Sequence, residues 1–111
     1  MSIKVNKNVT IQGGLDVALG SIIKVDIKSS HLKNEDDKYN QLIYLTYYRD
    51  SGSAGIEAMP TPKEFGYDRF NIELTSEELT GLSMAMIHNK AIEYLVNNNS
   101  GGFVNADFKI V

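Results

Sequence analysis

The sequence has no cysteine, only two prolines and no long apolar run among its 111 residues. The lack of cysteine excludes disulfide bonds and thiolate metal ligands, and it fits a reducing compartment. The longest uncharged apolar-rich run, Leu79–Ile87, is too short to span a bilayer, and the first residues lack the apolar core of a signal peptide. We therefore expect a protein made in the cytoplasm, with no membrane partner.

Concentrated positive charge is also missing. The chain carries 11 Lys and Arg residues against 14 Asp and Glu residues, interspersed along the sequence, for a net charge of −3. Binding to a nucleic-acid backbone needs a concentrated positive field, so we expect no direct nucleic-acid binding. The hydrophobic content of 42% and the length are typical of one globular domain, which we expect to span residues 1–111.

A tyrosine-rich run is the most informative part of the sequence. Four of the six tyrosines lie within Tyr39–Tyr48, which predicts a long strand with large side chains on both faces. The run Ser21–Lys28 alternates apolar and charged residues and predicts a strand with one solvated face. The polar stretch Ser29–Lys38 joins the two strands into a long antiparallel hairpin. The faces of the tyrosine strand are Leu42, Tyr44, Thr46 and Tyr48 on one side, and Ile43, Leu45, Tyr47 and Arg49 on the other.

The remaining strands are shorter. Alternating apolar residues predict one or two strands within Ile3–Ile11, one at Phe70–Leu74 and one at Phe103–Val111. The segment 51–67 holds three glycines and both prolines, and it predicts a loop or projecting arm. Together these elements predict an α+β fold: a mainly antiparallel sheet or sandwich of five to six strands with one principal α-helix packed on it.

The helix is expected from about residue 76 to residue 97. Thr75 and Glu78 have the spacing of a capping box at its start. Its apolar residues surround the helix instead of forming one stripe, which is typical of a helix that is buried on all sides. Two explanations remain open: two shorter helices that break near His88–Lys90, or one helix covered by its own sheet and by another subunit.

No catalytic, cofactor or metal site is predicted. His31 and His88 are the only histidines, and neither has a partner at metal-ligand spacing. The acidic run Glu35–Asp37 predicts a solvated hairpin tip, and Gln12–Asp16 predicts a turn without the lysine of a phosphate-binding loop. A hydrolase is the weaker alternative, with an acid–base pair drawn from Glu57, Glu64, Asp68 and Glu73 around the arm.

The tyrosines admit more than one interpretation. They stabilise sheets by cross-strand packing, and tyrosine and arginine are also enriched at protein interfaces. Stacking on single-stranded nucleic acid is a third interpretation, which the lack of positive charge disfavours. The interface hypothesis names residues of the tyrosine strand and the arm, namely Tyr44, Tyr47, Tyr48, Arg49, Met59, Phe65 and Tyr67.

The order of these segments resembles small structural proteins of tailed bacteriophages, such as tail, neck or baseplate subunits. The resemblance lies in the strand-rich start Ser2–Asn6, the hairpin Ser21–Asp50, the arm Ser51–Gly66, the single helix and the final strand ending at Val111. It rests on this organisation and on no motif, so it assigns no functional residue. It implies a non-enzymatic assembly subunit of a virion, assembled in the host cytoplasm, that contacts copies of itself and other structural proteins.

A small-ligand binding domain is the alternative to an assembly subunit. Its pocket would lie between the sheet and the helix and would be lined by Tyr44, Tyr48 and methionines. We regard a small-molecule partner as the less favoured interpretation, because nothing in the sequence resembles a cofactor-binding motif.

Overall fold

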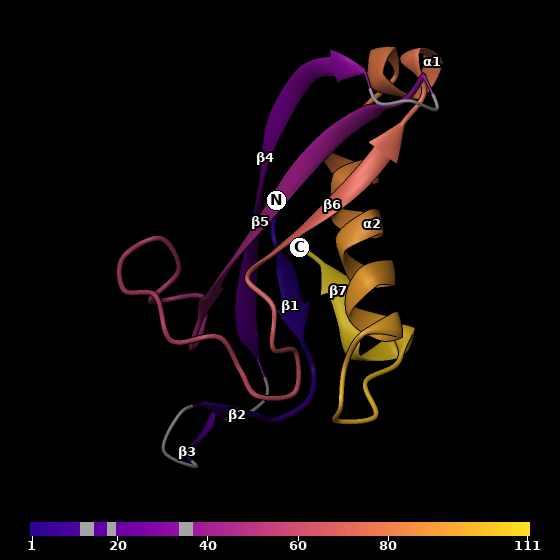
Figure 1. Ribbon diagram of the computed structural model, residues 1–111. Coiled ribbons are helices and arrows are strands. Elements are labelled where there is room, and N and C mark those ends of the chain that lie inside the picture. The colour runs from indigo at the N-terminus through magenta and orange to yellow at the C-terminus, as the bar shows by residue number, and fades with distance from the viewer. Residues whose placement is uncertain (12–14, 18–19, 34–36) are drawn as a thin grey trace.

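The predicted hairpin forms the middle of a five-stranded antiparallel sheet with the order β6-β5-β4-β1-β7 (Figure 1). In the computed structural model, which describes residues 1–11, 15–17, 20–33 and 37–111, β4 (Ser21–Lys33) pairs with β5 (Tyr39–Tyr48). β4 continues past its predicted end because its ladder resumes at Lys33, opposite Tyr39, after a register shift. Residues 12–14 of the predicted turn Gln12–Asp16 lie outside the described residues, whereas Leu15 and Asp16 belong to a short strand. Most of the acidic tip Glu35–Asp37 also lies outside the described residues.

Short strands complete the sheet on both sides of the hairpin. β1 (Ile3–Val5) lies between β4 and β7 (Phe108–Ile110), and β6 (Arg69–Leu74) pairs with β5. β2 (Val9–Ile11) and β3 (Leu15–Val17) form a separate two-stranded sheet. The predicted α+β class is therefore confirmed. The last strand is shorter than predicted because a 3-10 turn, η1 (Asn105–Asp107), precedes it.

The helical segment is divided in two. α1 (Ser76–Thr80) begins with the predicted capping box, in which Thr75 and Glu78 exchange side-chain hydrogen bonds to backbone N–H groups. α2 (Met84–Asn97) has its own cap, since the Ser83 hydroxyl accepts a hydrogen bond from the Met86 N–H. The division falls before Ser83 and not at His88–Lys90, because a new N-cap at Ser83 starts a second helix there.

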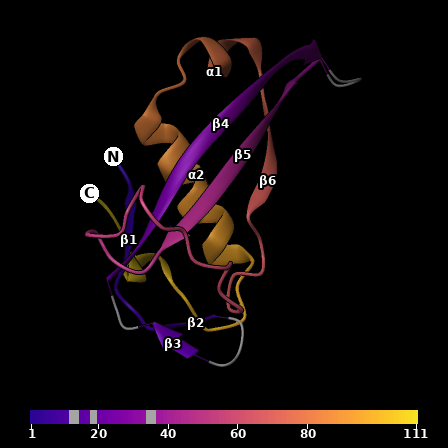
Figure 2. The same ribbon diagram turned by 90° about the vertical axis from the view of Figure 1, so that its left-hand side faces the viewer.

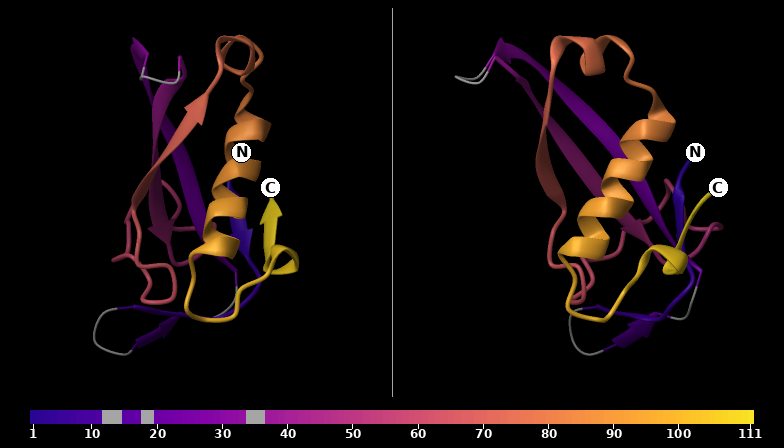
Figure 3. Two further views of the ribbon diagram at one scale, coloured as in Figure 1. Left: turned by 45° about the vertical axis from the view of Figure 1, so that its right-hand side comes forward. Right: turned by 90° about the vertical axis from the view of Figure 1, so that its right-hand side faces the viewer.

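α2 covers one face of the sheet, which we call the inner face (Figure 3). Alternation along each strand directs one set of apolar side chains toward this helix, and almost all of them are buried. The helix contributes Ile87, Ala91, Ile92 and Leu95 to the same core. The sheet contributes Ile3, Val5, Ile23, Val25, Ile43, Leu45, Tyr47, Phe70 and Phe108.

The opposite face, which we call the outer face, is covered only at one end. Figure 2 looks onto it, with β4 and β5 in front of α2 and the loop after β5 crossing its lower end. The half-buried side chains Leu42, Tyr44, Thr46 and Tyr48 lie on this face. The tyrosine strand therefore has a helix on one face and mostly solvent on the other.

The segment predicted as an arm has two parts. Residues 51–58 form a largely exposed loop on the outer-face side of the sheet (Figure 1). Met59 then forms a single bridge to Tyr47, and Phe65 is buried in the core at 2% exposure. Only the first part projects, because the second part supplies apolar side chains to the chain's own core.

Candidate functional site at the β6 edge

The outer edge of β6 leaves backbone hydrogen-bonding groups open. The Leu45 N–H donates to the Asp68 carbonyl over 2.8 Å, which fixes Leu45 and Asp68 as a hydrogen-bonded pair of the antiparallel ladder. Because such pairs alternate along a ladder, the N–H and C=O groups of Phe70 and Ile72 point to β5. Those of Arg69 and Asn71 therefore point away from the sheet, at an edge where the topology places no further strand of the described chain.

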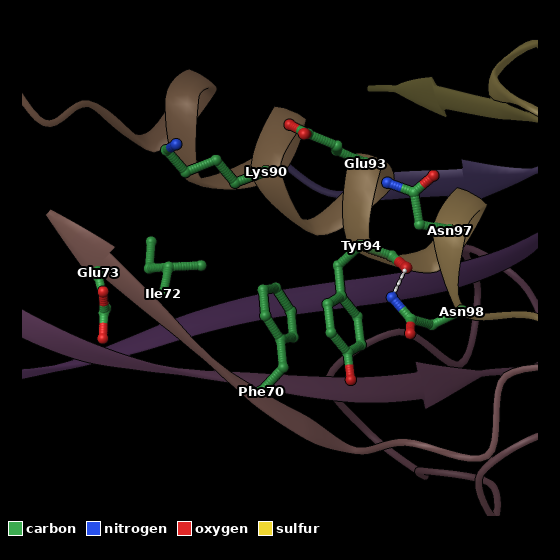
Figure 4. A pocket seen from close by; sticks show the side chains of 8 residues that line it. All are labelled: Phe70, Ile72, Glu73, Lys90, Glu93, Tyr94, Asn97 and Asn98. Carbon is green, nitrogen blue, oxygen red and sulfur yellow. Dashed lines mark hydrogen bonds between the residues drawn. The ribbon is translucent and has the colours of Figure 1, made fainter.

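An open groove lies beside this edge, between β6 and α2. It has a volume of about 310 Å³, and we call it the α2–β6 groove. In Figure 4, Tyr94 extends from α2 to lie next to Phe70 of β6, and Ile72 points from β6 toward the helix. The groove has an apolar floor and a polar rim, and it is lined by Phe70, Ile72, Glu73, Lys90, Glu93, Tyr94, Asn97 and Asn98.

Aromatic stacking fixes the floor of the groove. The rings of Phe70 and Tyr94 are almost parallel, with centroids 4.1 Å apart and an interplanar angle of 6°. Tyr67 meets the Tyr94 ring edge-on, with centroids 5.6 Å apart. Burial, and then the neighbouring Tyr67, raise the pKa of Tyr94 above its ordinary value, so its hydroxyl stays neutral and available as a donor at physiological pH. Such stacked rings give the floor a defined shape.

The sequence predicted a small-ligand pocket between the sheet and the helix only as an alternative, with Tyr44, Tyr48 and methionines in its lining. Tyr44 and Tyr48 lie instead on the outer face of the sheet. None of these predicted residues lines the α2–β6 groove. Its two walls come from β6 and α2, and their side-by-side position follows from the strand order, which periodicity does not reveal. The predicted strand Phe70–Leu74 placed Phe70 and Ile72 on one face, as found. The backbone groups at Asn71 became identifiable only with the ladder.

The predicted interface residues divide into two sets. Tyr47, Met59 and Phe65 are buried within this chain and contribute to its stability. Tyr44 and Tyr48 are half-buried on the outer face, while Arg49 and Tyr67 are exposed. Only Tyr67 of these residues reaches the groove, through its contact with Tyr94.

Tyr47 illustrates why a tyrosine belongs in this core. Its hydroxyl donates a 2.7 Å hydrogen bond to the Tyr67 carbonyl, so its one polar atom is satisfied. Burial, followed by the nearby charge of Asp68, raises the pKa of Tyr47 well above its ordinary range. The side chain therefore remains neutral and acts as a core residue with an anchored tip.

Two of the four acidic residues proposed for hydrolysis, Glu64 and Asp68, make separate contacts within the chain. Both carboxylate oxygens of Glu64 accept a hydrogen bond from the Thr10 N–H, over 3.0 and 2.9 Å. Partial burial acts to raise the pKa of Glu64, but the hydrogen bonds from Thr10 outweigh it and hold the pKa below its ordinary value. A general acid at neutral pH requires the opposite shift. Asp68 forms an exposed ion pair with Arg69 over 3.3 Å.

Metal ligands do not gather at any point in the part of the chain that the structure describes. His88 is fully buried in α2, where its Nδ1 lies 2.6 Å from the Met84 carbonyl. Its Nε2 has no hydrogen-bond partner among the described residues. The side chain of His31 lies outside the described residues.

Gln41 is a second buried polar residue, and no local pattern in the sequence predicts its burial. It lies on the inner face of β5, next to Ile72 in the register, with no exposed surface. Neither its amide nitrogen nor its amide oxygen has a partner among the described residues. An amide left in this state destabilises the folded chain.

Comparison with protein-family models, with curated proteins and with solved structures gives no match for this chain. None of the helices in the described ranges is both long and apolar enough to cross a membrane. The candidate functional site therefore follows from the geometry of the chain alone. It consists of the β6 edge and the α2–β6 groove beside it.

Proposed function

We propose that this protein is a non-enzymatic assembly subunit that acts through protein–protein contacts, and that its primary contact is the pairing of β6 with β6 of a second copy. The observation that carries the proposal is the open edge of β6 beside an apolar groove. A strand that presents unpaired backbone groups is a template for another strand.

The sequence of β6 is self-complementary in one antiparallel register. If the pair is centred on Asn71, each Arg69 lies opposite Glu73 of the other copy, and the two Asn71 residues face each other. All three positions belong to the outward-pointing set, and the central pair of Asn71 residues forms two backbone hydrogen bonds in this register. Shifting it by two residues removes the charge match at both ends.

The inner face supports the same register. Phe70 of one copy lies opposite Ile72 of the other, so apolar side chains meet in the two grooves. The two-fold axis is perpendicular to the sheet, and both α2 helices therefore stay on one side. Such an isologous contact joins two five-stranded sheets into one continuous sheet.

A virion is the setting that the resemblance to phage structural proteins implies, with assembly in the host cytoplasm. Small assembly subunits associate with copies of themselves and with other structural proteins, and the open strand edge suits that role. The β6 pairing itself does not depend on this setting, because it follows from the backbone ladder and the charges of β6.

Sedimentation velocity and native mass spectrometry of three proteins test the proposal. We expect the wild type to form a dimer, and we expect Asn71→Pro to weaken it at least tenfold, because proline removes the outward N–H and places its ring at the contact. Since this N–H makes no bond within the sheet, the fold should tolerate the proline. Asn71→Thr keeps the N–H and serves as the matched control.

A wild-type protein that stays monomeric up to about 100 μM would contradict the proposal, as this concentration lies well above the dissociation constants of specific assemblies. The charges of Arg69 and Glu73 would then act to protect the edge from other strands. A dimer that Asn71→Pro and Asn71→Thr leave equally intact would place the contact elsewhere on the molecule.

A further inference from the structure

We infer a second activity on another surface: the outer face of the sheet binds single-stranded nucleic acid. This inference does not rest on the β6 pairing. It comes from the charges and rings that the strand register gathers on one face, although they are dispersed along the sequence. The net charge of the whole chain hides this local excess.

Strand alternation collects positive charge on the outer face. Lys24 and Lys28 of β4 lie on this face. Lys4 of β1 lies on it too, because the register places Lys4 opposite Ile22 of β4 and Lys109 of β7. Only two acidic residues occupy the same face of the five strands. Its charged side chains are Lys4, Lys24, Lys28, Arg69 and Lys109 against Asp26 and Glu73.

Three of these lysines make no polar contact with other described residues. Within the described ranges, none of Lys4, Lys24 and Lys109 takes part in an ion pair or a hydrogen bond. Lys4 and Lys109 are exposed, and Lys24 is half-buried. Among the described residues nothing pairs with their charges, which are therefore available to phosphates.

Tyr44 lies at the centre of this face between two cations. The Lys28 ammonium lies 5.7 Å and the Arg69 guanidinium 5.6 Å from the centroid of its ring. Tyr48 lies on the same face of β5, four residues further along the strand. Half-exposed rings, one of them flanked by two cations, match a ligand that alternates planar bases with phosphates.

An acidic protein surface is the alternative partner for this face. The rings of Tyr44 and Tyr48 favour single-stranded nucleic acid instead. Carboxylates need the cations alone, whereas Tyr44 and Tyr48 also offer half-exposed aromatic rings on the outer face, toward which Figure 2 looks. Base stacking on aromatic side chains tolerates any sequence, so we expect binding with little sequence preference. Duplex DNA has its bases already stacked and should bind more weakly.

Fluorescence anisotropy with labelled dT and rU oligonucleotides of about 12 residues tests this inference, because salt dependence reports the phosphates contacted. We expect saturable binding at about 50 mM salt that weakens as salt rises, with a log–log slope of roughly −2 to −3, equivalent to three or four phosphates. We expect Tyr44→Leu to weaken binding by about tenfold while it retains the apolar bulk of the strand.

A matched pair of charge variants separates the face from the net charge. Lys24→Glu with Lys28→Glu should weaken binding at least tenfold, whereas Lys63→Glu with Lys90→Glu makes the same change in net charge at two residues outside the five strands. Circular dichroism confirms that each variant is folded. Asn71→Pro should still bind, which separates this activity from dimerisation.

Three results would overturn the inference. One is the absence of any anisotropy change at about 100 μM protein in low salt, where even non-specific binding is detectable. Another is an equal loss of binding in the two charge pairs. The third is competition by poly-glutamate as effective as that by unlabelled oligonucleotide, with Tyr44→Leu unchanged, which would assign the face to an acidic protein partner.

Discussion

The two edges of the sheet differ in length and in what supports them. β7 has three residues, and its partner β1 is tied to it at the chain ends, where Ser2 and Val111 exchange hydrogen bonds of 2.9 and 2.8 Å. β6 has six residues, a groove next to it and an outer side on which no other strand of the described residues pairs. A short edge offers a partner strand little to pair with, whereas a longer one offers a full register.

The cores behind the two edges differ as well. Behind β7, Phe65 packs against Phe103 and Phe108, with centroids 4.9 and 5.9 Å away, and it stacks on Tyr47. Behind β6, the stacked pair of Phe70 and Tyr94 is open to the groove. The β7 end is therefore the more closely packed of the two, and the β6 end is the one that we propose for assembly.

The largest expected effect tests the stabilising end. Phe65→Ala removes a buried ring from the aromatic cluster and should lower the free energy of unfolding by about 3–5 kcal/mol. Tyr94→Ala, at the open end, should cost less than half of that, because its ring is only half-buried. Urea denaturation measures both values, and equal losses would remove the distinction between the two ends.

The next effect tests the charge match across β6. Arg69→Glu places two like-charged pairs in the dimer and should raise its dissociation constant by about tenfold. Glu73→Arg should do the same. The double variant restores opposite charges and should return close to the wild-type constant, as measured by sedimentation equilibrium. If the double variant loses as much dimer affinity as the two single variants together, this register is excluded.

A smaller effect is an expected gain in the free energy of unfolding from a substitution at Gln41. Gln41→Met replaces an amide that has no partner among the described residues by an apolar chain of similar shape, and it should raise the stability by about 1 kcal/mol. Gln41→Glu, with a charge in the same position, should lower it. If Gln41→Met destabilises the chain, the amide has a partner that makes it useful there.

The smallest effect concerns acid sensitivity near β2. Because the folded-state pKa of Glu64 is lowered, its stabilising contribution is present above the unfolded pKa and is lost as the pH falls through the folded value. Glu64→Gln should therefore cost under about 1 kcal/mol at pH 7 and almost nothing near pH 3. Denaturation at both pH values measures the difference, and a cost that grows at low pH would contradict the assignment.

The sequence predicted the faces of the strands and the pairing within the hairpin, but not the order of the other strands in the sheet. Alternation in Ser21–Lys28 and the tyrosine strand identified the hairpin and both of its faces, and the capping box at Thr75 marked the start of the helical segment. Those features depend on local periodicity. The division before Ser83 was not predicted. The apolar residues surround the helical segment, and one explanation of this pattern predicted a break near His88–Lys90 instead.

Features that depend on contacts between distant parts of the chain could not be predicted from the sequence. Phe65 lies in a segment rich in glycine and proline, and nothing local indicates that its ring enters the core. The open side of Asn71 and the gathering of lysines on the outer face both depend on strand order and register. A chain with dispersed charge therefore gains a positively charged surface only on folding.

Disulfide trapping tests the β6 pairing most directly, since the chain has no cysteine of its own. In the proposed register the two Asn71 Cα atoms lie about 5.5 Å apart, within reach of a disulfide. Mild oxidation should therefore link Asn71→Cys into dimers rapidly, and should link Arg69→Cys to Glu73→Cys when the two are mixed. Lys109→Cys at the opposite edge, or Arg69→Cys alone, should remain monomeric on gels. A dimeric protein whose Asn71→Cys variant links no faster than Lys109→Cys would contradict the account.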